Sequence, residues 1–403
     1  MSVEVRACEQ AEVLSALAPI WHYFGKEPTE ESVLPVTRFL EPRRAHAAWS
    51  AGAVVGGASA FSFDLTVPGG RLPAAGVTVV GVLPTHRRRG VLSALMRAQL
   101  DDVHERGEPL AILWASEERI YGRFGYGMAS LGGEIDLLRH HAAFHERFEP
   151  RGQTRLVSVA EALDGFPRVY DRVAAETPGM YARSAEWWET RILTDSPEWR
   201  GGGGEMARVM FEADGQPEGY ALYRLHMSFE QGVSTSFLRV IEALGATLEG
   251  TRHVWRTLLD LDWMERVKAG LLPIDHPLFF LLAEPRRMRF RVGDALWVRL
   301  VDVGEALSGR SYAVDGAVVI EVADHFCPWN EGRWKLEAGQ AARTDQEADL
   351  RCEVSALGSV YLGGFTFAQL ARAGRVEELR PGGLERADAL FRTDRAPWCP
   401  EIF

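Results

Sequence analysis

The chain has 403 residues, with 45 Lys and Arg against 56 Asp and Glu, and a formal net charge of −11. This length predicts two or three domains. A content of 46% hydrophobic and 25% charged residues is typical of a globular protein and excludes a mainly disordered chain. The acidic charge argues against nucleic-acid partners, and no apolar run reaches about 18 residues, so no membrane span is expected.

The first third predicts short strands and one helix. Residues 46–63 are typical of two strands around a glycine-containing turn, and the Val-rich run 76–83 predicts a central strand. After the basic loop PTHRRRG, a helix is predicted from Val91 to the stop at Gly107, with one apolar face formed by Leu92, Leu95, Met96, Leu100 and Val103. Residues 110–115 predict a buried strand that should run parallel to the first.

The middle third repeats this order of elements without a second basic loop. Its predicted elements are a helical segment within 178–194, a hairpin over 206–225, a strand over 236–243 and a helix over 250–261. In the last third the predicted elements are a strand over 296–303, a hairpin over 311–322, a strand over 350–357, and helices over 365–374 and 386–391.

Cysteine and histidine spacing bears on metals and on compartment. The four cysteines, Cys8, Cys327, Cys352 and Cys399, form no Cys-x-x-Cys pair and predict reduced thiols in a cytoplasmic protein. His22, His86 and His104 fit no metal-ligand spacing, so no metal is expected. The N-terminus carries acidic residues where a signal peptide would be basic and then apolar, so no leader is expected either.

The basic loop is the sharpest chemical motif of the sequence. The first amides of a helix have no intrahelical partners and lie at the positive end of its dipole, so a turn of this kind attracts phosphate oxygens. Three arginines, Arg87 to Arg89, add charge, and Gly90 lets the backbone approach a ligand closely. A solvated connecting loop is the alternative, and the position between a Val-rich strand and an amphipathic helix favours phosphate binding.

Several motifs together resemble a known family. Arg87-x-x-Gly90 resembles the pyrophosphate-binding signature of the GNAT acetyltransferases, although Leu92 stands where Gly or Ala is usual. The segments ASE at 115–117, IYGRFGYG at 120–127, LWVRLVDV at 296–303 and the C-terminal RAPWCPEIF resemble the Eis (enhanced intracellular survival) family over the whole chain.

The resemblance implies a mixed α+β fold of three parts. An N-terminal GNAT acetyltransferase domain is expected over residues 1–148, and a degenerate GNAT-like domain over 149–286. A sterol-carrier-protein-like domain is expected over 287–403. The absence of a second RRRG motif from the middle third fits a degenerate repeat.

The resemblance also implies an activity and its residues. It implies an acetyl-coenzyme A-dependent N-acetyltransferase for amines of cationic small molecules, with aminoglycosides as the implied class. The implied cofactor-binding residues are Val80, Gly81, Val82, Arg88, Arg89, Gly90, Val91, Leu92, Ser93, Ser116 and Glu117. Tyr121 is the implied general acid, with Tyr126 as its rival. The α-carboxylate of Phe403 is the implied general base, although an ordinary pKa of about 3.5 makes such a group a weak base unless it is desolvated.

The acceptor site and the assembly rest on the same resemblance. Trp21, Phe24 and Glu401 are expected to bind the acceptor, because aromatic and acidic groups suit a polyamine, while core packing is the alternative for the aromatic pair. A homohexamer without nucleic-acid or membrane partners is implied. Two other functions stay open: an acyl-coenzyme A or lipid binding protein without turnover, and a protein-lysine acetyltransferase.

Overall fold

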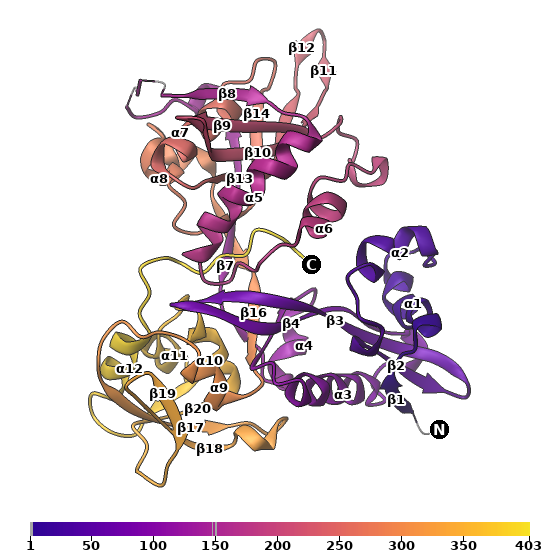
Figure 1. Cartoon of the computed structure of the whole chain (residues 1–403), viewed down its shortest axis with the longest axis vertical. Helices are drawn as coiled ribbons and strands as arrows, with labels where there is room; N and C mark the ends of the chain where they lie inside the picture. Colours follow the sequence, from indigo (N-terminus) through magenta and orange to yellow (C-terminus); the bar gives the residue numbers. More distant parts are fainter. Residues whose placement is uncertain (1–2, 147, 150) are drawn as a thin grey trace. The chain divides into compact units, whose positions relative to one another are not determined.

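The computed structural model describes residues 3–146, 148–149 and 151–403 (Figure 1). Contacts divide the chain into two units. Unit 1 comprises Met1–Ser130, Ala295–Asp394 and Ile402–Phe403, and unit 2 comprises Leu131–Asp294 and Arg395–Glu401. The division therefore does not follow the chain in order, because unit 1 is built from both ends of the sequence. In the part of the chain that the structure describes, every helix is too short or too polar to cross a lipid bilayer.

The larger sheet of unit 1 has seven strands in the order β1-β2-β3-β4-β5-β16-β6. These strands are β1 Glu4–Ala7, β2 Ala45–Ser50, β3 Ala53–Val67, β4 Gly70–Val82, β5 Leu110–Trp114, β6 Gly127–Met128 and β16 Leu296–Leu300. The sheet is completed by β16, which comes from far along the sequence and pairs antiparallel with both β5 and β6. The predicted strand at 296–303 is thus confirmed, and it belongs to the sheet of the first third.

The hairpin and the parallel pair predicted for the first third are both confirmed. Ala51 and Gly52 have φ values of 51° and 79°, the two left-handed residues that a tight hairpin turn requires. Strands β4 and β5 run parallel, but they pair only from Ala74–Leu110 to Gly76–Ile112. In the described strands, residues 77–82 of β4 therefore have a backbone edge that β5 does not cover.

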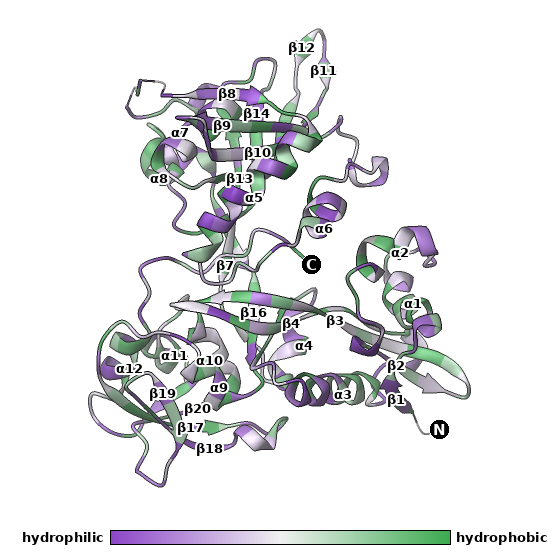
Figure 2. Cartoon of the chain, viewed as in Figure 1, coloured by the Kyte–Doolittle hydropathy of each residue, from purple (hydrophilic) through white to green (hydrophobic). Residues whose placement is uncertain are grey.

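Two helices cover opposite faces of this sheet, as two adjacent glycines of β3 show. A Cβ atom on Gly56 would lie 3.0 Å from side chains of α3 (Val91–Glu105), and one on Gly57 would lie 1.9 Å from the Ala16 carbonyl oxygen of α1 (Val13–Tyr23). Since successive side chains of a strand point to opposite faces, α1 and α3 pack on opposite sides. The helix predicted from Val91 is confirmed, and Figure 2 shows polar and apolar residues alternating along it.

The second sheet of unit 1 has the order β19-β18-β17-β20-β21. Its strands are β17 Ala317–Ala323, β18 Gly332–Glu337, β19 Gln340–Arg343, β20 Leu350–Glu353 and β21 Val376–Glu378. The helices beside it are α9 Val303–Ser308, α10 Val354–Tyr361, α11 Phe367–Arg372 and α12 Gly383–Phe391. The two helices predicted over 365–374 and 386–391 correspond to α11 and α12 and are confirmed.

Two predictions for this region were wrong. The hairpin over 311–322 does not form, because the backbone amides of Ser311 and Ala313 donate to the carbonyl oxygens of Pro68 and Leu390, so only β17 is a strand. The strand predicted over 350–357 ends at Glu353, and α10 follows at once. All residues of α10 are buried, and the pattern of a short buried segment does not distinguish a strand from a helix.

Unit 2 contains the second seven-stranded sheet, in the order β15-β7-β14-β13-β10-β9-β8. Its strands are β7 Leu131–Leu138, β8 Gln153–Leu156, β9 Ala207–Ala213, β10 Gln216–His226, β13 Phe237–Gly245, β14 Arg266–Pro273 and β15 Arg291–Asp294, and a separate hairpin pairs β11 Phe229–Glu230 with β12 Val233–Ser234. The principal helices are α5 Val159–Ala175, α6 Ala185–Trp187, α7 Leu248–Leu259 and α8 Leu278–Leu281. Strand β7 lies within the range 1–148 predicted for the first domain, yet it pairs in this sheet.

The predicted elements of the middle third are present in unit 2. The hairpin of β9 and β10 turns at Asp214 and Gly215, both with positive φ. Strand β13 and helix α7 correspond to the predicted strand and helix at 236–243 and 250–261. Within 178–194 the helical part is α6 and one π-helical turn over Trp188–Ile192.

Candidate functional site

A pocket of about 580 Å³ in unit 1 is formed where α1, the end of β4, the start of α3 and α4 (Glu118–Tyr121) meet. We call it the unit 1 pocket. Its lining residues are Ile20, Tyr23, Phe24, Val80, Gly81, Val82, His86, Arg87, Arg88, Gly90, Val91, Leu92, Ser93, Ser116, Glu117, Arg119, Ile120, Tyr121 and Arg123. Four arginines against one glutamate make the lining locally basic, in a chain whose net charge is −11.

A bulge in β4 shapes the wall of this pocket. Gly57 of β3 pairs with Gly81 and Ser59 pairs with Thr78, so two residues of β4 oppose the single residue between them. One of the two, Val79, has φ +50°, which is strained for a β-branched residue. Bulges of this kind redirect a strand next to functional sites. Here Val80 is the second residue of the bulge and begins the segment Val80 to Val82, whose backbone edge β5 leaves uncovered and which lines the pocket.

Helix α1 packs directly against the end of β4. A Cβ atom on Gly81 would lie 2.7 Å from the backbone nitrogen of Ile20, so only glycine permits the contact. The Tyr23 hydroxyl donates a hydrogen bond to the Val82 carbonyl oxygen over 2.7 Å. The sequence assigned Gly81 to the cofactor, and the structure gives the same residue a packing role.

The basic loop leads from β4 into α3 with an open backbone. Gly90 is the N-cap of α3 at φ +80°, with no side-chain cap, and no atom lies within 4 Å of where its Cβ would be. Arg88 also has a positive φ, of 61°. The first helical hydrogen bond runs from the Ala94 amide to the Gly90 carbonyl, which leaves the amides of 91–93 without helical partners. These amides and the exposed arginines form a concave cradle suited to an anion.

Tyr121 ends α4 on the wall of the same pocket. Its side chain is only 6% exposed, and burial, with a smaller contribution from Glu117, raises the pKa of its hydroxyl to about 12. The phenol is therefore fully protonated at neutral pH and can act as a proton donor. Its rival Tyr126 is fully buried behind it at a ring distance of 6.0 Å, and is not among the pocket residues.

Two glycines of the IYGRFGYG motif, Gly125 and Gly127, allow close contacts with two different elements. A Cβ atom on Gly125, which has φ +86°, would lie 2.7 Å from the guanidinium of Arg299. A Cβ atom on Gly127 would lie 1.8 Å from the Ser355 carbonyl oxygen of α10. The turn after Tyr121 is thus pressed against β16 and α10, both of which come from the last third of the chain.

Phe403 lies on the larger sheet of unit 1. The Thr78 hydroxyl of β4 donates a hydrogen bond to the main-chain oxygen of Phe403 over 3.2 Å, and the Phe403 ring meets that of Phe63 edge-on at 4.9 Å. Val77, directly before Thr78, and Val80, two residues after it, pack in the same apolar cluster as Tyr121. One segment of β4, residues 77–80, therefore contacts both Phe403 and the apolar cluster that contains Tyr121.

The structure brings most of the predicted site residues together. Of the predicted cofactor-binding residues all except Arg89 line the unit 1 pocket, together with Tyr121 and Phe24. Trp21, Glu401 and Phe403 are not in its lining. The contacts of all these residues with a ligand stay predictions. Residues not predicted include Ile20, Arg119 and Arg123. Ile20 follows Ala16 by one helical turn of α1, and Arg123 stands within the IYGRFGYG motif, so both gave a signal in the sequence.

Comparison with known proteins places the chain in a family. The sequence model of a GNAT acetyltransferase domain matches residues 4–129, a second such model matches 179–300, and that of the sterol carrier protein domain matches 303–400. An uncharacterized N-acetyltransferase of Streptomyces avermitilis is 41% identical over the full length of both chains. The N-acetyltransferase Eis of Mycobacterium tuberculosis is 36% identical over 85% of this chain and 84% of its own.

The chain belongs to the Eis family of N-acetyltransferases. The crystal structure of Eis1 from Mycobacterium abscessus, 36% identical, matches 99% of this chain and 100% of its own with a TM-score of 0.86. The predicted fold class of two GNAT-like domains followed by a sterol-carrier-protein-like domain is confirmed, and the protein is a GNAT-type acetyltransferase.

The second GNAT domain of this Eis-family chain lacks the cradle of the first. At the start of α7 the Thr247 hydroxyl caps the Gly250 amide, and Glu249 follows in the first turn. A Cβ atom on Gly250 would lie 2.0 Å from the Glu218 carbonyl oxygen, so β10 presses on the turn. A self-capped, acidic and crowded helix start offers no room or charge for a phosphate group. The degenerate character predicted for this domain therefore has a local cause.

Glu401 belongs to unit 2, where its carboxylate is surrounded by partners. It accepts hydrogen bonds from Tyr181 at 2.7 Å and Trp187 at 3.0 Å, and pairs with Arg183 at 3.1 Å and Arg191 at 3.3 Å. Arg183 is itself fully buried, with two bonds to Glu242. This cluster anchors the segment 395–401, and the acceptor contact predicted for Glu401 stays a prediction.

We expect the substitution Arg183→Met to destabilise unit 2 strongly. It leaves the buried carboxylates of Glu242 and Glu401 without their shared cation, and breaking a buried pair from one side costs about 3–5 kcal/mol. Urea denaturation followed by tryptophan fluorescence measures the loss. The control Arg183→Met with Glu242→Leu removes one stranded charge and should recover part of it. An unchanged unfolding midpoint in the single variant would contradict this account.

Proposed function

We propose that the protein transfers the acetyl group of acetyl-coenzyme A to an amine of a cationic small molecule, with aminoglycosides as the class to test first. The observation that carries the proposal is the unit 1 pocket, which joins an open, arginine-rich anion cradle to a buried, protonated tyrosine. A transferase for a phosphate-bearing thioester needs both groups within one cavity.

The residues of the pocket fit acetyl-coenzyme A, which GNAT acetyltransferases use. The space beside Gly90 is free for a diphosphate, and Arg87, Arg88 and the amides of 91–93 would bind it. The uncovered edge of Val80 to Val82 offers amide and carbonyl groups to the pantetheine arm, although the Val82 carbonyl already accepts a bond from Tyr23. Ser116 and Glu117, directly after β5, would lie along the same ligand.

Tyr121 is the proposed general acid of the reaction. When bound, the thioester supplies an acetyl carbonyl carbon, to which the amine nitrogen bonds while the carbon–sulfur bond breaks. The Tyr121 hydroxyl would donate its proton to the departing sulfur, and a position 6% exposed keeps bulk water from competing for that proton. The phenolate then recovers a proton from solvent.

The α-carboxylate of Phe403 is the proposed general base. It would accept the proton that the amine loses, directly or through one water. The hydrogen bond from Thr78 of β4 and the edge-on contact with Phe63 of β3 support the proposal, because they hold Phe403 on the larger sheet of unit 1.

The acceptor class is proposed from the aromatic mouth of the pocket. Phe24 lines it with 67% of its surface exposed, and Trp21 meets the Phe24 ring edge-on at 6.4 Å. Exposed aromatic faces bind ammonium groups by cation–π attraction, and the acidic net charge draws cations towards the protein.

Resemblance to the Eis family supports a cytoplasmic homohexamer, which light scattering of the purified protein would test.

A thiol-release assay tests the function. Purified protein is incubated with acetyl-coenzyme A and a panel of aminoglycosides, linear polyamines and lysine peptides, and free thiol is measured over time. We expect turnover with the polycationic small molecules. Turnover with lysine peptides alone would favour a protein-lysine acetyltransferase, and binding without turnover across the panel would favour a sensor.

We expect one or two residues added after Phe403 to abolish most activity. Each residue moves the carboxylate by about 3.3–3.6 Å in an extended chain, whereas proton transfer needs about 2.6–3.2 Å or one water. The extended protein should still fold and bind acetyl-coenzyme A in calorimetry. A matching extension at the N-terminus is the control. Full activity of the C-terminally extended protein would eliminate the terminal carboxylate as the base.

A further inference from the structure

A buried ion pair lies directly behind the turn that carries Tyr121. Arg299 of β16 and Asp324, which follows β17, are 0% and 1% exposed in their side chains. The guanidinium donates two hydrogen bonds to the carboxylate, at 2.9 and 2.6 Å. A buried pair of this kind is weak support for stability as such, so its place in the fold has to explain it.

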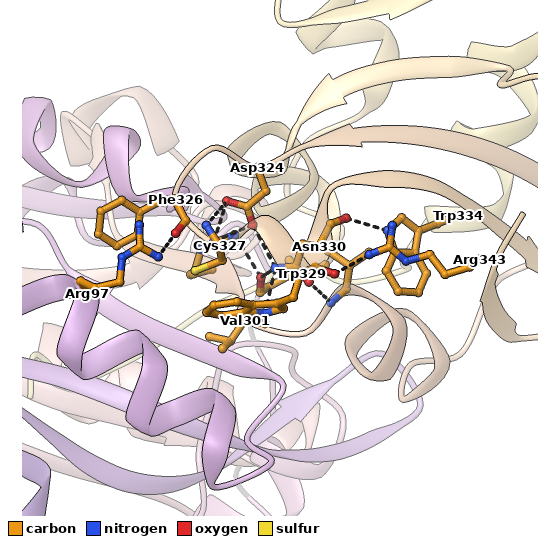
Figure 3. A network of polar contacts seen from close by, with 12 residues as sticks. Arg97, Val301, Asp324, Phe326, Cys327, Trp329, Asn330, Trp334 and Arg343 are labelled. Carbon is orange, nitrogen blue, oxygen red and sulfur yellow. Dashed lines mark hydrogen bonds and ion pairs between the residues drawn. The ribbon is translucent and has the colours of Figure 1, made fainter.

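Asp324 organises the loop 324–330 of the sterol-carrier-protein-like part. Its carboxylate also accepts the Cys327 amide at 3.0 Å and the Asn330 side-chain amide at 2.9 Å (Figure 3). Asn330 in turn accepts the Val303 amide, and the Trp329 indole donates to the Val301 carbonyl oxygen at 2.8 Å. One carboxylate therefore fixes the whole loop against the end of β16.

The same loop holds α3, the helix whose start forms the anion cradle. Arg97 of α3 donates to the Phe326 carbonyl oxygen, and its guanidinium lies 3.9 Å from the centre of the Phe326 ring (Figure 3). One further point of attachment is Trp329, whose ring stacks on His104 at 4.4 Å. The loop is thus attached to α3 at two points, one near the middle and one near its C-terminal end.

On its other side, the pair supports the turn after Tyr121. The chain closes there through the Gly125 amide to the Gly122 carbonyl at 3.0 Å and the Tyr126 amide to the Tyr121 carbonyl at 3.3 Å. Gly125 rests on the Arg299 guanidinium so closely that a Cβ atom would lie 2.7 Å from it. Phe124, in the same turn, meets Phe326 of the loop edge-on at 5.0 Å.

We infer that Arg299 and Asp324 are positioning residues for the transfer reaction, which hold the Tyr121 turn in register with the start of α3. The inference rests on the proposed function, in which Tyr121 is the acid and the start of α3 binds the diphosphate. In this role the sterol-carrier-protein-like part supports the Tyr121 turn and α3 of the first GNAT domain. A displacement of about 1 Å in a reacting group can lower a rate roughly 10²-fold.

The test separates positioning from stability with two variants of the full-length protein. Asp324→Asn should lower kcat roughly 10- to 10²-fold while the affinity for acetyl-coenzyme A and the KM for the amine change little. The pair Arg299→Met with Asp324→Asn removes both charges, which often restores stability, and the side-chain oxygen of the asparagine can still accept the Cys327 amide. We expect its melting temperature to recover and its kcat to stay low. On a Tyr121→Phe background, Asp324→Asn should cost little more, because both changes act through one hydroxyl.

Asp349→Asn is the matched control. Asp349 is 6% exposed, pairs with Arg386 at 2.6 Å and accepts the Val319 amide at 2.9 Å, so it resembles Asp324 in chemistry but lies directly before β20 of the second sheet. It should lower the melting temperature and leave kcat unchanged. Recovery of kcat along with stability in the double variant, or losses that multiply on the Tyr121→Phe background, would overturn the inference. Full activity of Tyr121→Phe alone would instead refute the proposed acid.

Discussion

Replacing Tyr121 by phenylalanine is expected to lower kcat roughly 10²–10⁴-fold, the range for a lost general acid. The change removes one hydroxyl and keeps a ring that is 6% exposed and packed in the apolar cluster around β5. Affinity for acetyl-coenzyme A should change little, because the anion cradle lies at the start of α3. Steady-state kinetics with a thiol reagent gives kcat, and calorimetry gives the affinity.

Tyr126→Phe is the control for this experiment. Its hydroxyl is fully buried and has no hydrogen-bond partner among the described residues, so its removal leaves no group unpaired. Activity should stay close to that of the unmodified protein. If Tyr126→Phe lost more activity than Tyr121→Phe, the assignment of the acid would have to be reversed.

Gly90→Asp is expected to weaken acetyl-coenzyme A binding by roughly 10²-fold or more, since like charges about 4 Å apart repel by about 4 kcal/mol near a protein surface. The fold should survive, because nothing lies within 4 Å of the added Cβ and Asp tolerates a left-handed backbone better than most residues. Calorimetric titration with acetyl-coenzyme A measures the loss.

Gly90→Asn isolates the charge in this comparison. Asn has the shape of Asp, shares its tolerance of positive φ and carries no charge. It should therefore retain most of the affinity, and whatever it loses measures crowding and strain. Equal affinities of the Asp and Asn variants for acetyl-coenzyme A would contradict the binding of phosphate beside Gly90.

Local signals predicted the parts of the fold that local chemistry decides. The strand, basic loop and helix from Val77 to Glu105 have apolar periodicity and a glycine stop, and all of these elements form as expected. The predictions failed where distant partners decide. Ser311 and Ala313 look like strand residues, but their amides find Pro68 and Leu390 instead of a neighbouring strand.

For the candidate site the same division holds. The arginine loop and Tyr121 stand in recognisable motifs, and the structure places them at one pocket. The Tyr23 hydrogen bond to Val82 and the pair of Arg299 with Asp324 join residues 59 and 25 positions apart, and no spacing rule connects them. The left-handed backbone conformation of Val79 could not be predicted either, because a valine in a Val-rich run indicates a regular strand.

The late arrival of β16 has a consequence during synthesis of the chain. The ribosome makes β5 first, and at about 5–20 residues per second roughly 10–40 s pass before β16 emerges to pair with it. Until then the edge of β5 is an unpaired template on which another nascent chain could add a strand. The first third of the chain therefore cannot complete the sheet of the acetyltransferase domain. A chaperone that shields the edge of β5 would raise the yield of active protein. A truncated gene that ends before Leu296 would give no active protein.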